Sequence, residues 1–161
     1  MKPFFESAER QSLIARVAKS WIDTRFVPHA RLRGAGVDCV HLAAEIYQEC
    51  GVFPEYRFPA HTIDAGAHLD ISQVLAWLEA SSAFKRVMAP PAGKYIPGTP
   101  DWPIPGDLLC FNLARVEHHI GTMVNEAYMI HVFARRGVKY GAFQDPTYRE
   151  HVTAIYRPVE L

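Results

Sequence analysis

The sequence predicts an α+β fold in which N-terminal helices pack on one side of a C-terminal antiparallel sheet. The N-terminal part of the chain carries two stretches with apolar residues at helical spacing. The last third instead carries four short segments rich in β-branched and aromatic residues, with turn signals between them: "DLLCFNL", "HIGTMVN", "YMIHVF" and "TAIYRPV". Helices first and strands afterwards are typical of the α+β class, and we expect the helices to pack on one side of a meandering sheet.

The composition is that of a globular protein, with 161 residues, 49% of them hydrophobic and 21% charged. This length fits one domain with one core, so we expect residues 1–161 to form a single domain. The 17 basic residues balance 17 acidic ones. Neither nucleic acid nor a membrane is therefore an expected partner.

Export and cross-linking signals are missing from the sequence. The N-terminus, "MKPFFESAERQSLIARVAKSWI", lacks the uninterrupted apolar core of a signal peptide, and no stretch approaches the ~20 apolar residues of a spanning helix. We therefore expect cytoplasmic synthesis. The three cysteines, Cys39, Cys50 and Cys110, resemble neither a disulfide framework nor a zinc site, which favours reduced thiols and no metal.

The first helix is expected from Ser7, a suitable N-cap, to about Trp21. Residues 23–38 contain Pro28 and two glycines and are expected to form a loop. The second helix is expected from Cys39 to Cys50, with Asp38 as its N-cap and Gly51 just past its end. Its polar residues share one stripe, so most of this helix is predicted to be buried.

The middle section, residues 52–106, is expected to begin and end without regular structure. Within it, "DISQVLAWLEASSAF" repeats apolar residues helically behind Asp70 and predicts a third helix. Six prolines between residues 90 and 105 remove too many backbone donors for a helix or a central strand. They predict an ordered connecting arm.

Cys39 is the cysteine best placed for chemistry. A thiol is nucleophilic as the thiolate, and the first turn of a helix favours the thiolate through its dipole and free N–H groups. The same N–H groups can hold the oxyanion of an acyl-transfer intermediate. Cys50 lies at the negative helix end and Cys110 within an apolar strand, so both are expected to be packing residues.

A nucleophilic cysteine needs a base, and the chain has eight histidines. His41 lies about 200° around the helix from Cys39, which predicts a solvated surface residue. The histidines in loop or turn contexts give no indication of a catalytic role, so we interpret them as residues without one: His29, His61, His68 and His151.

The pair His118-His119 opens a predicted strand, so alternation sends the two rings to opposite faces and only one can face the helix of Cys39. His119 shares a face with Gly121 and Met123, and the small Gly121 leaves space beside the ring. His131, in the next strand, is either a core residue or the group that holds the His119 imidazole in the correct tautomer.

Four stretches of the chain together resemble the NlpC-type cysteine peptidases, a papain-like family that cleaves bacterial cell-wall peptides. "GVDCVHL" is similar to the Asp-Cys motif of that family, "PGDLLCF" to its first core strand, and "HHIGTMV" to its His-[Val/Ile]-Gly strand. "MIHV", followed by the expected Gly137-Val138 turn, falls where the third triad residue belongs. The correspondence runs from about Trp21 to the C-terminus.

The resemblance implies a papain-like fold and a thiol hydrolase without metal or organic cofactor. Cys39 is then the nucleophile, His119 the general base and His131 the residue that orients it, while His118 falls outside the triad. The implied partners are peptidoglycan stem peptides. The phage-tail-associated branch is most similar, because it shares "GVDC" and an enlarged segment, here about residues 52–106, and this implies assembly with other tail proteins.

The chain departs from the family pattern around the expected site. Many members carry a tyrosine before the cysteine where this chain has Phe26, so that hydroxyl is missing or is replaced by His29. The usual Ser-Gly after the cysteine is replaced by Val40-His41, which makes the entrance bulkier. The enlarged segment, with Trp77, Trp102 and the proline arm, shapes a substrate groove or docks onto neighbours. Phe26, His29 and Trp102 are the candidate substrate contacts.

Two other interpretations stay open at the level of sequence. One is a structural phage tail-tip protein with a vestigial hydrolase site, motivated by Phe26 and the proline arm. The other is a thiol acyltransferase or amidase that acts on a lipid or protein.

Overall fold

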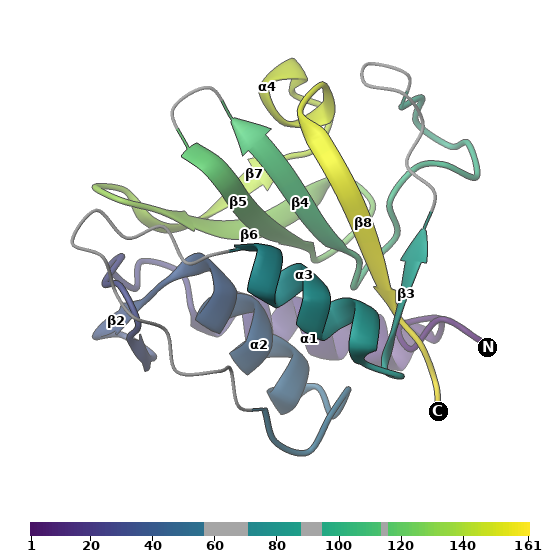
Figure 1. Ribbon diagram of the computed structural model, residues 1–161, viewed down its shortest axis with the longest axis horizontal. Helices are drawn as coiled ribbons and strands as arrows, with labels where there is room; N and C mark the ends of the chain where they lie inside the picture. The colour runs from purple at the N-terminus through teal and green to yellow at the C-terminus, as the bar shows by residue number, and fades with distance from the viewer. Residues whose placement is uncertain (57–70, 88–94, 114–115) are drawn as a thin grey trace.

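Three helices cover one face of a six-stranded antiparallel sheet in the computed structural model, which describes residues 1–56, 71–87, 95–113 and 116–161 (Figure 1). The helices are α1 (Ala8–Ser20), α2 (Cys39–Glu49) and α3 (Ile71–Ala80). Both termini lie at the same end of the molecule, beside β3 (Phe84–Val87). This arrangement confirms the predicted α+β class.

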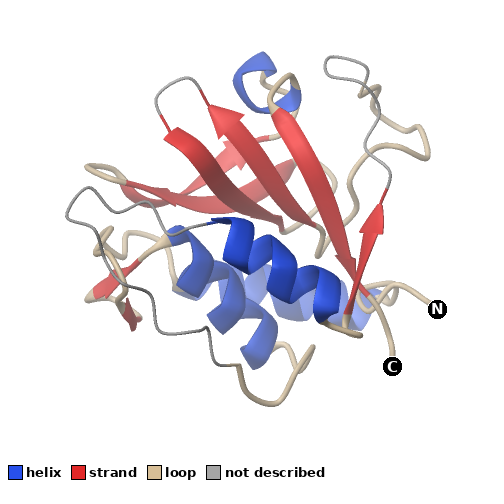
Figure 2. Cartoon of the chain, viewed as in Figure 1, coloured by secondary structure: helices blue, strands red, loops and turns tan. Residues whose placement is uncertain are grey.

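The sheet has the strand order β3-β8-β4-β5-β6-β7, and all its neighbouring strands are antiparallel (Figure 2). Its remaining strands are β4 (Leu108–Leu113), β5 (Val116–Met123), β6 (Tyr128–Phe133), β7 (Gly137–Ala142) and β8 (Val152–Pro158). Strands β4 to β7 are neighbours both in the chain and in the sheet, and they form a meander that ends at the edge strand β7. β8 returns to the other side of β4, so the predicted simple meander is correct only in part.

The helix boundaries follow the expected capping residues. The Ser7 side chain accepts a hydrogen bond from the Arg10 N–H, and the Asp38 side chain accepts one from the His41 N–H. Gly51 follows α2 with φ +80°, a conformation that favours glycine. Local sequence signals therefore set where α2 begins and ends.

Side chains on the two faces of the sheet enter two hydrophobic cores. Residues such as Cys110, Ile120 and Val132 pack against α1 and α2, whereas Phe111 and Met129 pack on the opposite face. The alternation along each strand explains this division. The face that a side chain occupies therefore decides whether it can meet the helices.

Several short elements were not predicted. Residues 23–38 contain a two-stranded hairpin of β1 (Arg31–Leu32) and β2 (Gly36–Val37), and residues 137–138, expected as a turn, begin β7. α4 (Pro146–Arg149) and β3 were also missed. Of the prediction for the middle section, α3 is confirmed, while Asp70 and residues 90–94 of the proline arm lie outside the described residues.

Candidate active site

Cys39 is the first residue of α2. Asp38 precedes it with an extended backbone, and its carboxylate accepts the His41 N–H at 2.8 Å. Cys39 is partly exposed, whereas Cys50 and Cys110 are buried. The partial exposure of the residue as a whole and its place at the positive end of a helix distinguish Cys39 from the other two cysteines.

The sheet opens in front of this end of α2. Strands β5 and β6 are paired only at Thr122 with Ile130 and at Met123 with Met129. Well beyond these positions, β5 stays paired with β4, and β6 stays paired with β7. α2 packs against both separated strands. The backbone N–H of Ile120 interacts with the Cys39 sulfur, so the thiol lies one residue along β5 from His119.

The imidazoles of His119 and His131 lie side by side across this opening. Nε2 of His119 is 2.9 Å from Nδ1 of His131, a hydrogen-bond distance, and both residues are buried. Because this contact uses Nε2, the ring nitrogen of His119 that remains for a thiol is Nδ1. The sequence-based expectation that His131 lies beside His119 is confirmed as a contact.

Aromatic rings hold the two imidazoles in place. Phe133 stacks on His119, with ring centroids 4.2 Å apart and planes 13° apart, and meets the edge of His131 at 4.7 Å. Tyr148 lies 5.3 Å from His131. Neither was singled out from the sequence as a site residue, because a strand aromatic such as Phe133 more often signals core packing and the short helix that carries Tyr148 was not predicted.

His119 does not face α2, contrary to the expectation drawn from strand alternation. Its ring lies near Phe111 and Phe133, on the face opposite the one where Ile120 packs against the helices. The prediction assumed that the thiol meets the strand through the helix-covered face. Instead, Cys39 meets β5 at its backbone, where the strands have separated.

Burial keeps both imidazoles neutral. It lowers the pKa of His119 to about 3, with a further contribution from His131, and lowers the pKa of His131 to about 4, with a further contribution from Arg136. A neutral imidazole carries one N–H and one lone pair. The contact between the rings is therefore one N–H···N hydrogen bond, whose direction fixes the tautomers of both histidines.

Burial of the sulfur, together with the nearby Asp38 carboxylate, raises the pKa of Cys39 to about 12. The backbone N–H groups of Ile120, Cys39 and Val40 act in the opposite direction. The resting site therefore holds a neutral thiol beside neutral imidazoles. In such a site the thiol must lose its proton to a base during attack rather than beforehand.

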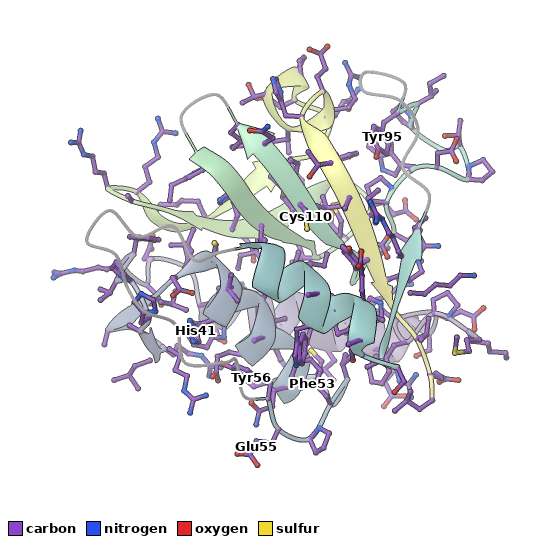
Figure 3. All side chains as sticks on the ribbon, in the orientation of Figure 1. His41, Phe53, Glu55, Tyr56, Tyr95 and Cys110 are labelled. Carbon is purple, nitrogen blue, oxygen red and sulfur yellow. The ribbon has the colours of Figure 1, made fainter. Side chains whose placement is uncertain are left out.

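His41 is not the solvated residue that the sequence predicted. Its ring nitrogen Nδ1 lies 2.8 Å from Oδ1 of Asp38, and its side chain is only 13% exposed. Figure 3 shows His41 and Tyr56 beside α2, on the side turned away from the sheet. His41 bends back to the helix cap because Asp38, three residues earlier, lies on the same helix edge.

Asp38 joins the start of α2 to the preceding loop. Its Oδ2 accepts the backbone N–H of His29 at 2.7 Å, while Oδ1 accepts the His41 groups. Burial alone raises the pKa of this carboxyl, but the hydrogen bonds and the charge of His41 outweigh it, and the net pKa is lowered. The sequence indicated the capping role of Asp38 but not this contact with the loop.

Phe26 and His29 lie on that loop. Phe26 bridges to Val37, just before the cap, and packs partly buried against the helical core. His29 adopts φ +62°, which is uncommon for a residue other than glycine, and its N–H is held by Asp38. Through these two contacts, both candidate residues lie close in space to Asp38 or its neighbour Val37, and therefore to the start of α2.

Trp102 lies at the other end of the β5–β6 pair from the histidines. Its indole N–H donates to the carbonyl of Glu126 at 2.9 Å, and its ring packs on Phe143. It lines a groove with Pro97, Pro105 and Tyr128. The structure does not bring Trp102 together with the paired histidines.

The remaining histidines are accounted for only in part. His151 lies 2.9 Å from the carbonyl of Thr147 through Nδ1. His61, His68 and the side chain of His118 lie outside the described residues. Within the described ranges, no group of three His, Cys, Asp or Glu side chains is arranged to hold a metal ion.

None of the helices in the described part of the chain is long and apolar enough to cross a membrane.

The helices on one face of an antiparallel sheet, with a cysteine opening the helix that meets the sheet, define a papain-like α+β fold. Among solved structures, the chain is similar to an NlpC/P60 family protein from Bacillus cereus, with a TM-score of 0.52 and 17% sequence identity. The match covers 90% of this chain and 39% of that chain, so this chain spans well under half of the other protein. No protein-family model and no curated protein matches the sequence.

Proposed function

We propose that this protein is a thiol hydrolase that cuts amide bonds in the stem peptides of bacterial peptidoglycan. The observation that carries the proposal is the 2.9 Å contact between His119 and His131, next to the strand position whose N–H meets Cys39. The similarity of fold to an NlpC/P60 family protein supports the same reaction class. The substrate is inferred from the resemblance of the sequence motifs to that family.

In the proposed reaction, Sγ of Cys39 attacks the carbonyl carbon of the scissile amide. Nδ1 of His119 takes the thiol proton and then gives it to the leaving amine as the C–N bond breaks, which leaves a thioester on Cys39. A water molecule, deprotonated by the same nitrogen, attacks the thioester and releases the acid and the thiol. The Cys39 backbone N–H contributes to holding the oxyanion.

His131 acts by holding the His119 ring. When the proton of His119 is on Nε2, this N–H donates a hydrogen bond to Nδ1 of His131. The lone pair of His119 is then on Nδ1, where a base is required. The stacked Phe133 restricts rotation of that ring. His131 is therefore a positioning residue in this proposal.

The decisive experiment is mass spectrometry of the soluble muropeptides released from purified sacculi. Wild-type protein is expected to release stem-peptide fragments with new amino and carboxyl ends, and the Cys39→Ala variant is expected to release none. Cys110→Ala is the matched control, because that thiol is buried among apolar side chains of the helix-facing core. Equal release by the wild type and Cys39→Ala would contradict the proposal.

A second candidate function is a structural phage tail component whose hydrolase site is vestigial. The raised pKa of Cys39 and the presence of Phe26 in place of a hydroxyl-bearing residue favour it. It predicts that neither the wild type nor Cys39→Ala releases muropeptides. Assembly into a tail, with or without activity, is tested by searching for the protein in purified tail particles.

A further inference from the structure

Three arginines near the candidate active site have no carboxylate partner among the residues that the structure describes. Arg25 lies in the loop before β1, and Arg135 and Arg136 lie in the turn between β6 and β7, and all three are exposed. Among the side chains that the structure describes, these three form no ion pair and no side-chain hydrogen bond. By contrast, Arg33 and Arg157 are paired with carboxylates.

The loop and the turn that carry these arginines are in direct contact. Val138 donates its backbone N–H to the carbonyl of Thr24 at 2.9 Å. A β-carbon at Gly137 would lie 2.8 Å from that carbonyl oxygen and 3.7 Å from Cα of Arg25. Only a glycine permits so close an approach. The backbone of Arg25 therefore lies beside the end of the turn that carries Arg135 and Arg136, although more than a hundred residues separate the two segments in the chain.

The same turn adjoins the paired histidines. The backbone N–H of Arg136 donates to the carbonyl of Phe133 at 3.2 Å, and Phe133 stacks on His119. The charge of Arg136 also contributes to the lowered pKa of His131. The positive charge is thus next to the place where a substrate would lie.

The acidic residues of this region do not neutralise the three arginines. Asp23 is paired with Lys139, and Asp38 is buried against His41. Asp145 accepts the Thr147 N–H as the cap of α4, and it lies near Tyr148, as does Arg136. Like charges gathered on neighbouring turns repel one another, so an anion bound between them would relieve this repulsion.

We propose that Arg25, Arg135 and Arg136 bind carboxylates of the substrate peptide that flank the scissile amide. The proposal rests on the hydrolase function above and adds a charge requirement: stem peptides with free carboxylates are preferred over the same peptides with carboxamides. Guanidinium groups suit this task because their planar fork of N–H donors matches a carboxylate.

The test measures binding to the Cys39→Ala protein by calorimetry, so that no turnover interferes. Two probes are compared: a synthetic stem peptide with free carboxylates, and the same peptide with those groups converted to carboxamides. The free acid is expected to bind about tenfold more tightly, because charge-assisted hydrogen bonds are stronger than neutral ones. The difference should shrink as salt is raised, since the groups are exposed.

In the Cys39→Ala protein, the preference for the free-acid peptide should fall to less than about twofold when three further substitutions are added: Arg25→Gln, Arg135→Gln and Arg136→Gln. Adding Arg16→Gln and Lys19→Gln on α1 instead, both exposed, should leave it unchanged. An unchanged thermal unfolding midpoint shows that the triple variant is folded. Equal affinity for the two peptides, binding of neither, or a preference that survives the triple substitution would overturn the proposal.

The same measurements separate this inference from the proposed hydrolysis. If wild-type protein releases no muropeptides from sacculi but the charge preference is present, the hydrolase proposal fails and the arginine site stands. If sacculi are digested and the two peptides bind equally, the arginine site fails alone.

Discussion

Gly141 on β7 leaves the space that the imidazole of His131 occupies on β6. A β-carbon at residue 141 would lie 2.9 Å from Nε2 of His131 and 3.3 Å from the ring of Tyr148. Neither ring can retreat easily, because His131 is also held by His119 and Phe133. The position of this buried glycine on the edge strand β7 thus restricts that of a buried histidine on β6.

Gly141→Ala is therefore expected to displace His131 and to lower muropeptide release while the chain still folds. Overpacking of this kind destabilises a protein by about 1–3 kcal/mol. Activity and urea unfolding are measured on the same preparation, with Ala142→Ser, exposed on the same strand, as control. Full activity in Gly141→Ala would show that the His119–His131 contact is not needed.

Alkylation should distinguish the three cysteines by access. Limiting iodoacetamide is expected to label Cys39 well before Cys50 and Cys110, which are 6% and 2% exposed. Burial raises the pKa of Cys39 to about 12, so the rate of its labelling should rise about tenfold per pH unit from pH 6 to pH 9. Peptide mass spectrometry at timed intervals measures both effects. A rate that is already constant at pH 6 would instead indicate a resting thiolate.

Removing the charge of Asp38 should make Cys39 more reactive. Asp38→Asn keeps a good N-cap but eliminates the carboxylate that raises the pKa of the neighbouring thiol. Alkylation of Cys39 at pH 8 should therefore be faster in this variant. Asp23→Asn, an exposed carboxylate paired with Lys139, is the control and should leave the rate unchanged. Slower alkylation in Asp38→Asn would mean that Asp38 acts mainly by shaping the start of α2.

The buried histidines should make the protein less stable as the pH falls. In the folded state the pKa of His119 is about 3 and that of His131 about 4, whereas both are near 6.5 when unfolded. Below pH 6.5 the unfolded chain binds protons that the folded chain does not, so the free energy of unfolding decreases. Each histidine contributes up to about 1.4 kcal/mol per pH unit.

Urea unfolding between pH 7 and pH 5 measures this slope. His131→Asn removes one titrating group and should reduce the slope by the contribution of one histidine, whereas His151→Asn, at an exposed position, should not. Equal slopes for wild type and His131→Asn would contradict the assignment of a neutral, buried His131.

Much of the site followed from local rules. Asp38 before an apolar helical pattern predicted where α2 begins, and the helix dipole made Cys39 the candidate nucleophile. The spacing of His119 and His131 on successive strands predicted their pairing, and the structure brings them within 2.9 Å. The predicted roles of these residues in catalysis stay predictions.

One error was local: His41 was predicted to be solvated, although its ring contacts Asp38, the N-cap of the same helix three residues earlier. The other errors arose where distant segments meet. β7 was missed because Gly137 and Val138 read as a turn, yet Val138 is paired with Thr24 from the opposite end of the chain. The face of His119 was misassigned because alternation orders side chains along one strand without saying which face the helices cover.

The sequence by itself determined the class of fold, the ends of α2 and the candidate residues, because caps, periodicity and strand alternation depend on neighbours in the chain. Only the tertiary structure decided that β5 and β6 separate beyond Thr122 and Ile130, and that α2 meets the strands there. It also decided that the backbone of Arg25 lies beside Gly137, which follows Arg136 in the chain. These features depend on sheet twist and on packing between segments far apart in sequence, which no local pattern encodes.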